Sequence, residues 1–173
     1  MKKRTIGIVV MALALAGCHH TAPQNPSQRK GSEPAVDSAQ LALMELNQHL
    51  AATADMQLAQ IVQEQPERYA LYEGSAWVTI LDRGDENSET PKQNEEWTVH
   101  MRTYDLDGRM LMDSEATYRI GKRELPQAAE TAVAELYRGG KAKVIAPWYA
   151  AYGMQGNDFV APYQNVIIEL ELK

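Results

Sequence analysis

Cysteine is almost absent from this chain: Cys18 is the only one among its 173 residues. A single cysteine cannot close an internal disulfide, so an oxidising compartment leaves no cross-link in the fold. It also cannot supply the group of thiolates that a cysteine-ligated metal site needs. Disulfide scaffolds and cysteine-ligated metal proteins are therefore excluded.

Histidines and glycines are present, but not at the spacings that catalysis or cofactor binding needs. His49 and His100 have no partner at the spacing of a metal site or a catalytic triad, and His19-His20 lie in a polar stretch that favours solvated side chains. Gly139-Gly140 is followed by a predicted strand, whereas a phosphate-binding loop leads into a helix. The sequence predicts no metal ion and no cofactor.

Basic side chains are scarce beyond the first few residues. Removing residues 1–17 takes away three of the 17 basic groups and none of the 23 acids, which leaves 14 basic groups and a net charge of −9. Nucleic acids and anionic lipid surfaces are bound mainly through Lys and Arg. We therefore exclude nucleic acid as a partner.

The amino terminus has the form of an export signal. A basic stub precedes about a dozen apolar residues, too few for a bilayer span of roughly 20, and the run ends in Leu15-Ala16-Gly17-Cys18. This motif resembles the bacterial lipobox, which implies cleavage of residues 1–17 and lipidation of Cys18. The alternative is an ordinary signal peptide with a leftover thiol. Because no acidic residue directly follows Cys18, we expect an anchor in the outer membrane that faces the periplasm.

A tether and a helical segment are predicted next. Residues 18–36 contain three prolines and few apolar side chains, which predicts a disordered tether. Within residues 37–67, leucines at helical spacing predict a first helix over about 38–52, and Asp55 is expected to cap a second helix that ends before Pro66. Two short amphipathic helices cannot bury their stripes alone. We expect them to pack on the rest of the chain, on a second copy in a homodimer, or in an envelope complex.

Residues 68–173 change to the alternating pattern of strands. Apolar positions alternate in 97–103 and again in 166–172. One short helix is expected between them, with Pro126 in its first turn and Gly139-Gly140 as its stop. The predicted fold is α+β, an antiparallel sheet wrapped around one short helix.

Several motifs follow one another in a specific order in this domain. They are VHM at 99–101, LDG at 106–108, MDS at 112–114, YRIG at 118–121, AAYGMQG at 150–156 and VIIELEL at 166–172. From about Tyr72 to Lys173 this order resembles the FKBP-type peptidyl-prolyl cis-trans isomerases. The resemblance implies an FKBP-like half-barrel sheet around the helix, preceded here by the two amino-terminal helices. It also implies isomerisation of X-Pro bonds in polypeptides without a cofactor.

Carried over residue by residue, the family's pocket falls unevenly on this chain. The resemblance implies that Tyr152 binds the substrate carbonyl and that Asp113 is the pocket aspartate. The implied substrate-binding residues are Met101, Met112, Leu125, Pro126, Ala129, Val160 and Ile168. Ala129 stands where the family has a tryptophan floor, Ala116 replaces a wall aromatic, and Pro126 has no N–H to offer a ligand. These departures predict a wider pocket with one hydrogen-bond donor fewer.

Three functions stay open on the sequence alone. The first is an isomerase that assists the folding of exported or outer-membrane proteins. The second is a catalytically weak or inactive FKBP-like module that binds a partner in an envelope complex. The third is an unrelated α+β lipoprotein in which the aromatic side chains only fill the core.

Overall fold

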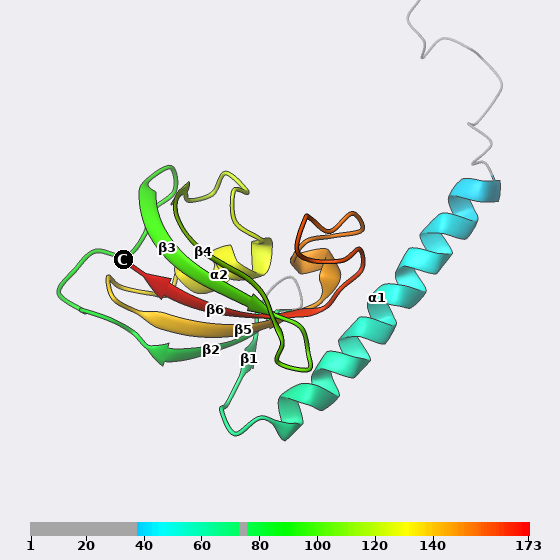
Figure 1. Cartoon of the computed structure of the whole chain (residues 1–173), viewed down its shortest axis with the longest axis horizontal. Coiled ribbons are helices and arrows are strands. Elements are labelled where there is room, and N and C mark those ends of the chain that lie inside the picture. The colour runs from blue at the N-terminus through cyan, green and yellow to red at the C-terminus, as the bar shows by residue number, and fades with distance from the viewer. Residues whose placement is uncertain (1–37, 73–75) are drawn as a thin grey trace, which may run out of the picture. The chain divides into compact units, whose positions relative to one another are not determined.

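The computed structural model of the protein describes residues 38–72 and 76–173. The predicted signal segment 1–17, the lipidation site Cys18 and the tether 18–36 lie outside the described residues. Residues Ser38–Lys173 form one compact unit (Figure 1).

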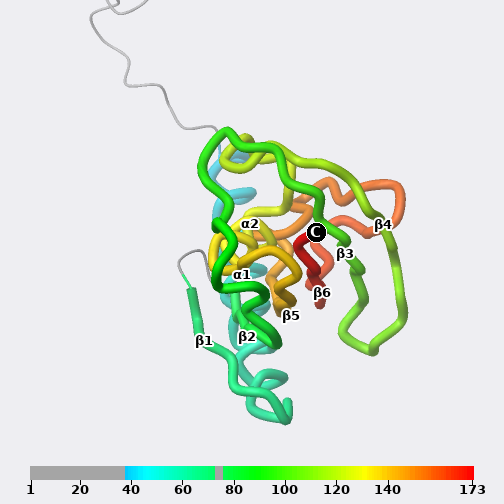
Figure 2. Tube along the Cα trace, turned by 90° about the vertical axis from the view of Figure 1, so that its left-hand side faces the viewer, coloured from blue at the N-terminus to red at the C-terminus, as the bar shows by residue number. Residues whose placement is uncertain are grey.

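Six strands of the described residues form a single sheet in the order β1-β2-β5-β6-β3-β4, and each neighbouring pair is antiparallel. The strands are β1 (Ala70–Leu71), β2 (Trp77–Asp82), β3 (Glu96–Tyr104), β4 (Met110–Arg119), β5 (Lys141–Ala146) and β6 (Val166–Leu172). Seen end-on, they follow one another in this order (Figure 2). The predicted antiparallel sheet is confirmed, with β3 inside it and β4 at its edge.

One face of the sheet carries the main core. In β3 the side chains alternate, and the buried ones are Trp97, Val99, Met101 and Thr103. The same alternation in β6 buries Val166, Ile168, Leu170 and Leu172. Helix α2 (Gln127–Val133) packs on β5 and β6 and adds its own buried side chains to this cluster. This arrangement is the predicted α+β fold, and we call the face that α2 covers the inner face.

Pro126 and a run of small residues shape α2. Pro126 has φ −52°, close to the angle that its ring imposes, and its carbonyl accepts the hydrogen bond from Glu130 N–H at 2.9 Å. Ala128, Ala129 and Ala132 are all buried, so the helix lies close to the sheet. Leu136 is also buried but follows the last helical residue, so the helix ends well before Gly139-Gly140, where we expected its stop.

The predicted pair of amino-terminal helices is wrong, because Ser38–Glu64 forms one continuous helix, α1. Asp55 lies inside this helix instead of capping a second one. No glycine or proline interrupts residues 38–64, and Ala51-Ala52-Thr53-Ala54 includes three strong helix formers, so nothing stops the first helix. The end before Pro66 is as predicted. Within the described ranges, no helix is long and apolar enough to cross a membrane.

Helix α1 packs through its carboxyl-terminal half. It contacts β5 and the short 3-10 helix η2 (Trp148–Ala150). Its two buried residues, Ala54 and Leu58, and the buried Ile145 of β5 do not belong to the main core cluster. We infer a second, smaller apolar contact on the side of β5 that faces away from α2.

Candidate functional site

Tyr152 lies in the loop that joins β5 to β6. The 3-10 helix η2 opens this loop, and the N–H of Gly153 donates to the carbonyl of Trp148 at 2.7 Å. Gly153 has φ +72°, a left-handed conformation that glycine adopts without steric cost. The turn that follows Tyr152 therefore depends on glycine.

The second half of the loop is held by Asn157. Its side-chain oxygen accepts hydrogen bonds from the N–H groups of Phe159 at 2.9 Å and Val160 at 2.7 Å. Gly156 is packed so tightly that a Cβ atom there would collide with the carbonyl oxygen of Val160. These contacts give the loop its own framework and fix where Val160 enters the core.

The hydroxyl of Tyr152 reaches the inner face of the sheet. Its oxygen lies 3.0 Å from Oγ1 of Thr103, a side chain of β3 that is 0% exposed. Burial raises the pKa of the Tyr152 phenol, and nearby Tyr118 adds to that shift, while the hydrogen bond with Thr103 acts in the opposite direction. The phenol is therefore a neutral hydrogen-bonding group at physiological pH.

Most of the expected pocket residues belong to the main core cluster, against which Tyr152 also packs. Five are buried members of the main core cluster, at 0% to 5% exposure: Met101, Leu125, Ala129, Val160 and Ile168. Met112 and Tyr152 are partly buried and pack against the same cluster. Pro126 is half-buried at the start of α2, next to Leu125. Seven of the nine predicted site residues thus belong to or pack against one apolar cluster, in which Met112 and Tyr152 are the partly exposed ones.

Asp113 lies apart from these residues. On β4 it lies opposite Arg102 of β3, whereas its neighbour Met112 lies opposite the inward Thr103. Its carboxylate is 2.7 Å from Nε2 of His100. Asp113 is therefore on the outer face of the sheet, whereas the hydroxyl of Tyr152 forms its hydrogen bond with Thr103 on the inner face.

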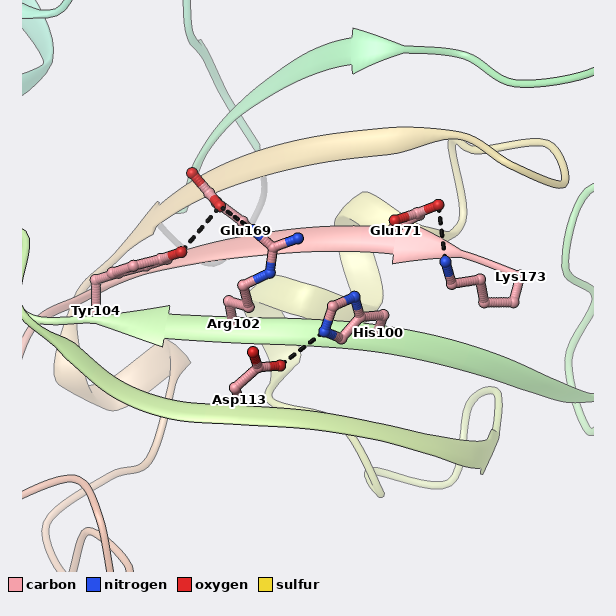
Figure 3. A network of polar contacts seen from close by, with 7 residues as sticks. All are labelled: His100, Arg102, Tyr104, Asp113, Glu169, Glu171 and Lys173. Atoms are coloured by element: carbon pink, nitrogen blue, oxygen red, sulfur yellow. Dashed lines mark hydrogen bonds and ion pairs between the residues drawn. The ribbon is translucent and has the colours of Figure 1, made fainter.

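The outer face carries a network of charged and polar side chains, shown in Figure 3 with α2 behind the sheet. Glu169 of β6 pairs with Arg102 at 3.5 Å and accepts a hydrogen bond from the hydroxyl of Tyr104 at 3.2 Å. A groove of about 240 Å³ lies here, lined by Leu81, His100, Arg102, Lys141, Ala142, Glu169, Leu170 and Glu171. This volume is below the roughly 300–1,000 Å³ of typical small-molecule sites. We therefore assign it no ligand.

Sequence reasoning missed two hydroxyl groups on the inner face. Thr103 lies at an inward position of the alternating stretch 97–103, but that alternation does not identify it as a partner of Tyr152. Ser114 lies opposite Met101 on β4, and within the described ranges its buried hydroxyl has no hydrogen-bond partner. The available signal was a polar side chain at an inward position of an otherwise apolar strand face.

This arrangement places the hydrogen-bonding phenol of Tyr152 beside a mainly apolar surface. In the part of the chain that the structure describes, no group of three or more His, Cys, Asp or Glu side chains is placed to hold a metal ion. A site of this composition suits recognition of an apolar group with an attached carbonyl, such as a prolyl peptide.

Solved structures show where this fold occurs. The chain matches FkpA from Escherichia coli with a TM-score of 0.60 and 18% identity, over 79% of this chain and 64% of that one. It matches a peptidyl-prolyl cis-trans isomerase from Pseudomonas syringae pv. tomato with a TM-score of 0.59 and 20% identity, over 72% of this chain and 92% of that one. It also matches the N-terminal domain of FKBP42 from Arabidopsis thaliana with a TM-score of 0.54 and 19% identity, over 62% of this chain and 91% of that one. The chain thus spans less than two thirds of FkpA. At sequence identities of 18% to 20%, these matches show a shared fold and nothing further.

The sequence itself carries the family signal. Among curated proteins, none matches the chain. The family model described as FKBP-type peptidyl-prolyl cis-trans isomerase matches residues 87–173, half of the sequence. This match excludes the third function considered from the sequence, an unrelated α+β lipoprotein. The chain belongs to the FKBP-type peptidyl-prolyl cis-trans isomerase family.

Proposed function

We propose that the protein catalyses cis-trans isomerisation of X-Pro peptide bonds in polypeptides. The observation that carries this proposal is the placement of Tyr152 in a family member: its side chain, like that of Met112, is partly buried against the apolar cluster that includes Val160, and its hydroxyl pairs with Thr103. In this proposal the proline ring contacts the apolar side chains, and Tyr152 donates a hydrogen bond to a substrate carbonyl.

The chemistry requires no nucleophile or metal ion. The barrier to rotation, about 18–20 kcal/mol, comes from the resonance that keeps the amide planar. A site that binds the twisted amide better than either planar form lowers this barrier. The apolar side chains keep water away from the rotating bond, and a fixed donor at the carbonyl stabilises the twisted state.

A protease-coupled assay on short prolyl peptides tests this function. We expect catalysis above the spontaneous rate, and a clear loss in Tyr152→Phe because that variant lacks the donor. Tyr104→Phe is the matched control, since it removes a phenol hydroxyl from the outer face, where Tyr104 binds Glu169. A parent protein that does not exceed the spontaneous rate, together with an unchanged Tyr152→Phe, would sink the proposal.

A second candidate function is a weak or inactive FKBP-like module that binds a partner. Two observations favour it. Ala129, Val160 and Ile168, expected as pocket walls, are at most 1% exposed, so little of them can touch a ligand without movement. Pro126 cannot donate a backbone hydrogen bond, a loss of about 1–3 kcal/mol if the ligand acceptor stays buried and unpaired. Calorimetric titration with the same peptides separates the candidates: binding without an increase in isomerisation rate supports the module.

We propose that the protein acts at the cell envelope on exported or outer-membrane proteins, held by lipid on Cys18. The motif at residues 15–18 supports this anchor, and two or three acyl chains on one residue bind a membrane stably. Incorporation of labelled palmitate into the parent but not into Cys18→Ser tests the anchor. Membrane fractionation and surface protease treatment then test an outer-membrane position that faces the periplasm. Parent protein that incorporates no label and stays in the soluble fraction would contradict the anchor.

We further propose that α1 associates with a second copy of the chain or with another envelope protein. Leu43 and Leu46 are each 52% exposed near the start of the helix. They lie four residues before Asn47 and Leu50, half-buried positions on the same face. Sedimentation of the chain from Cys18 onward tests homodimer formation, which Leu43→Gln with Leu46→Gln should abolish. A monomer that also recovers no envelope partner would contradict this role.

A further inference from the structure

Thr103 is a polar side chain at the centre of an apolar layer. It lies on β3 between two strands, opposite Met112 of β4 and Ile168 of β6. It is 0% exposed. A buried hydroxyl in such a place needs a hydrogen-bond partner to offset its lost hydration.

The hydroxyl of Tyr152, 3.0 Å away, is that partner. Within residues 38–72 and 76–173, Thr103 Oγ1 has no other hydrogen bond. Distance alone does not say which of the two oxygens is the donor. The number of available protons identifies the donor, because each hydroxyl has one proton to donate and can also accept a hydrogen bond.

If Tyr152 donated to Thr103, the proton of Thr103 would be left without an acceptor among apolar side chains. If Thr103 donates to the phenol oxygen, its proton is satisfied and the proton of Tyr152 stays available. Tyr152 is only partly buried, so that proton can reach water or a ligand. The second arrangement avoids the cost of an unsatisfied buried donor.

We propose that Thr103 is a positioning residue, which donates a hydrogen bond to the phenol oxygen of Tyr152 and so directs the Tyr152 proton toward the substrate carbonyl. This inference rests on the proposed isomerase function for its catalytic consequence. Its structural part, the direction of the hydrogen bond, stands independently. A hydroxyl that accepts one hydrogen bond also donates more strongly, so Thr103 would strengthen the bond from Tyr152 to substrate.

The first test is the titration of Tyr152, followed through the Cζ carbon of labelled tyrosine by nuclear magnetic resonance. A donor to the phenol oxygen stabilises the phenolate, whereas an acceptor stabilises the neutral phenol. Thr103→Val keeps the shape and removes the hydroxyl. We expect the pKa of Tyr152 to rise in this variant; a fall or no change would overturn the proposal. Tyr118 also affects Tyr152 electrostatically and is present in both proteins.

Thr98→Val is the matched control. Thr98 lies on the same strand, but its hydroxyl pairs with that of Thr117 at 3.0 Å on the outer face. This substitution should leave the Tyr152 titration unchanged. Thr103→Ser retains the donor and should restore the parent titration, which distinguishes loss of the hydroxyl from general disturbance of the core.

The second test is a double-mutant cycle in the isomerase assay. Thr103→Val should lower kcat about three- to tenfold with little change in KM, the effect of one hydrogen bond made in the transition state. In a Tyr152→Phe background it should have no further effect, because there is no phenol left to direct. Equal effects in both backgrounds would overturn the catalytic role. An inactive parent would refute the proposed function, while the titration would still decide whether Thr103 is the donor.

Discussion

The carboxylate of Asp113 lies 2.7 Å from Nε2 of His100, on the opposite face of the sheet from the hydroxyl of Tyr152. The family resemblance led us to expect Asp113 and Tyr152 in one pocket. They occupy opposite faces because Asp113 is paired with the outward Arg102. Asp113 is therefore part of the charged surface of the β3–β4 hairpin.

The first prediction concerns this pair. Asp113→Asn should change the isomerisation rate less than twofold, because the carboxylate faces away from Tyr152. The side chains are 22% (His100) and 49% (Asp113) exposed, so the substitution should lower the free energy of unfolding by about 1 kcal/mol or less. Prolyl-peptide kinetics and urea unfolding measure the two effects.

Tyr152→Phe is the positive control for that experiment. A loss of activity in Asp113→Asn as large as in Tyr152→Phe would mean that Asp113 reaches the substrate. His100→Gln, which removes the imidazole but keeps a polar side chain, should match Asp113→Asn in both measurements.

The patterns that predicted correctly are those in which periodicity determines burial. Alternation in 97–103 and 166–172 identified the inner face of β3 and β6, because a strand turns successive side chains to opposite faces. The face of Asp113 was not predictable in this way. The register of β3 and β4 shifts between Thr103 and Tyr104, and a shift of one residue moves a side chain to the other face.

Contacts between distant parts of the chain were also beyond local patterns. The hydroxyl of Tyr163 donates to Asn47 across 116 positions of sequence, at 3.2 Å. Amphipathic spacing indicated that residues 38–65 need a partner surface. It contained no information that this surface includes the loop that carries Tyr152.

The second prediction concerns Ala129, where the family resemblance places a tryptophan. Ala129 is 0% exposed on the side of α2 that faces the core, so an indole has no space without displacing neighbouring side chains. Ala129→Trp should lower the free energy of unfolding by about 1–3 kcal/mol or more, as measured by urea unfolding. Gln127→Trp, exposed on the same helix, is the control and should be close to neutral. An Ala129→Trp variant with parent stability and a higher isomerisation rate would show that an open pocket exists there.

The third prediction concerns the polar contacts between α1 and the loop of Tyr152. The hydroxyl of Tyr149 donates to the carboxylate of Asp55, and Asn165 donates to Gln57 at 3.2 Å. Asp55→Ala should therefore increase amide hydrogen exchange in residues 148–165, since a loop is ordered by the contacts that hold it. Mass spectrometry of exchanged peptides measures this change.

Gln60→Ala is the control for the helix, because Gln60 is exposed on α1. It should leave exchange in the loop as in the parent. If Asp55→Ala also leaves it unchanged, α1 does not order the loop. If exchange rises, the isomerisation rate should fall with it, because Tyr152 belongs to the same loop.

The fourth prediction is a loss of stability in alkaline solution that depends on Tyr69. Burial raises the pKa of Tyr69 to about 12, with further contributions from the charges of Glu67 and Glu169. In the unfolded chain the phenol loses its proton near pH 10. Between about pH 10 and 12 the unfolded state is deprotonated while the folded state still holds its proton, so stability falls as the pH rises through this window. Tyr69→Phe should remove that part of the pH dependence, as urea unfolding at pH 9 to 11 can measure.

At neutral pH the same variant should be at least as stable as the parent, because in the described chain the buried hydroxyl of Tyr69 has no hydrogen-bond partner to lose. A Tyr69→Phe protein with the same alkaline loss as the parent would assign that loss to other groups.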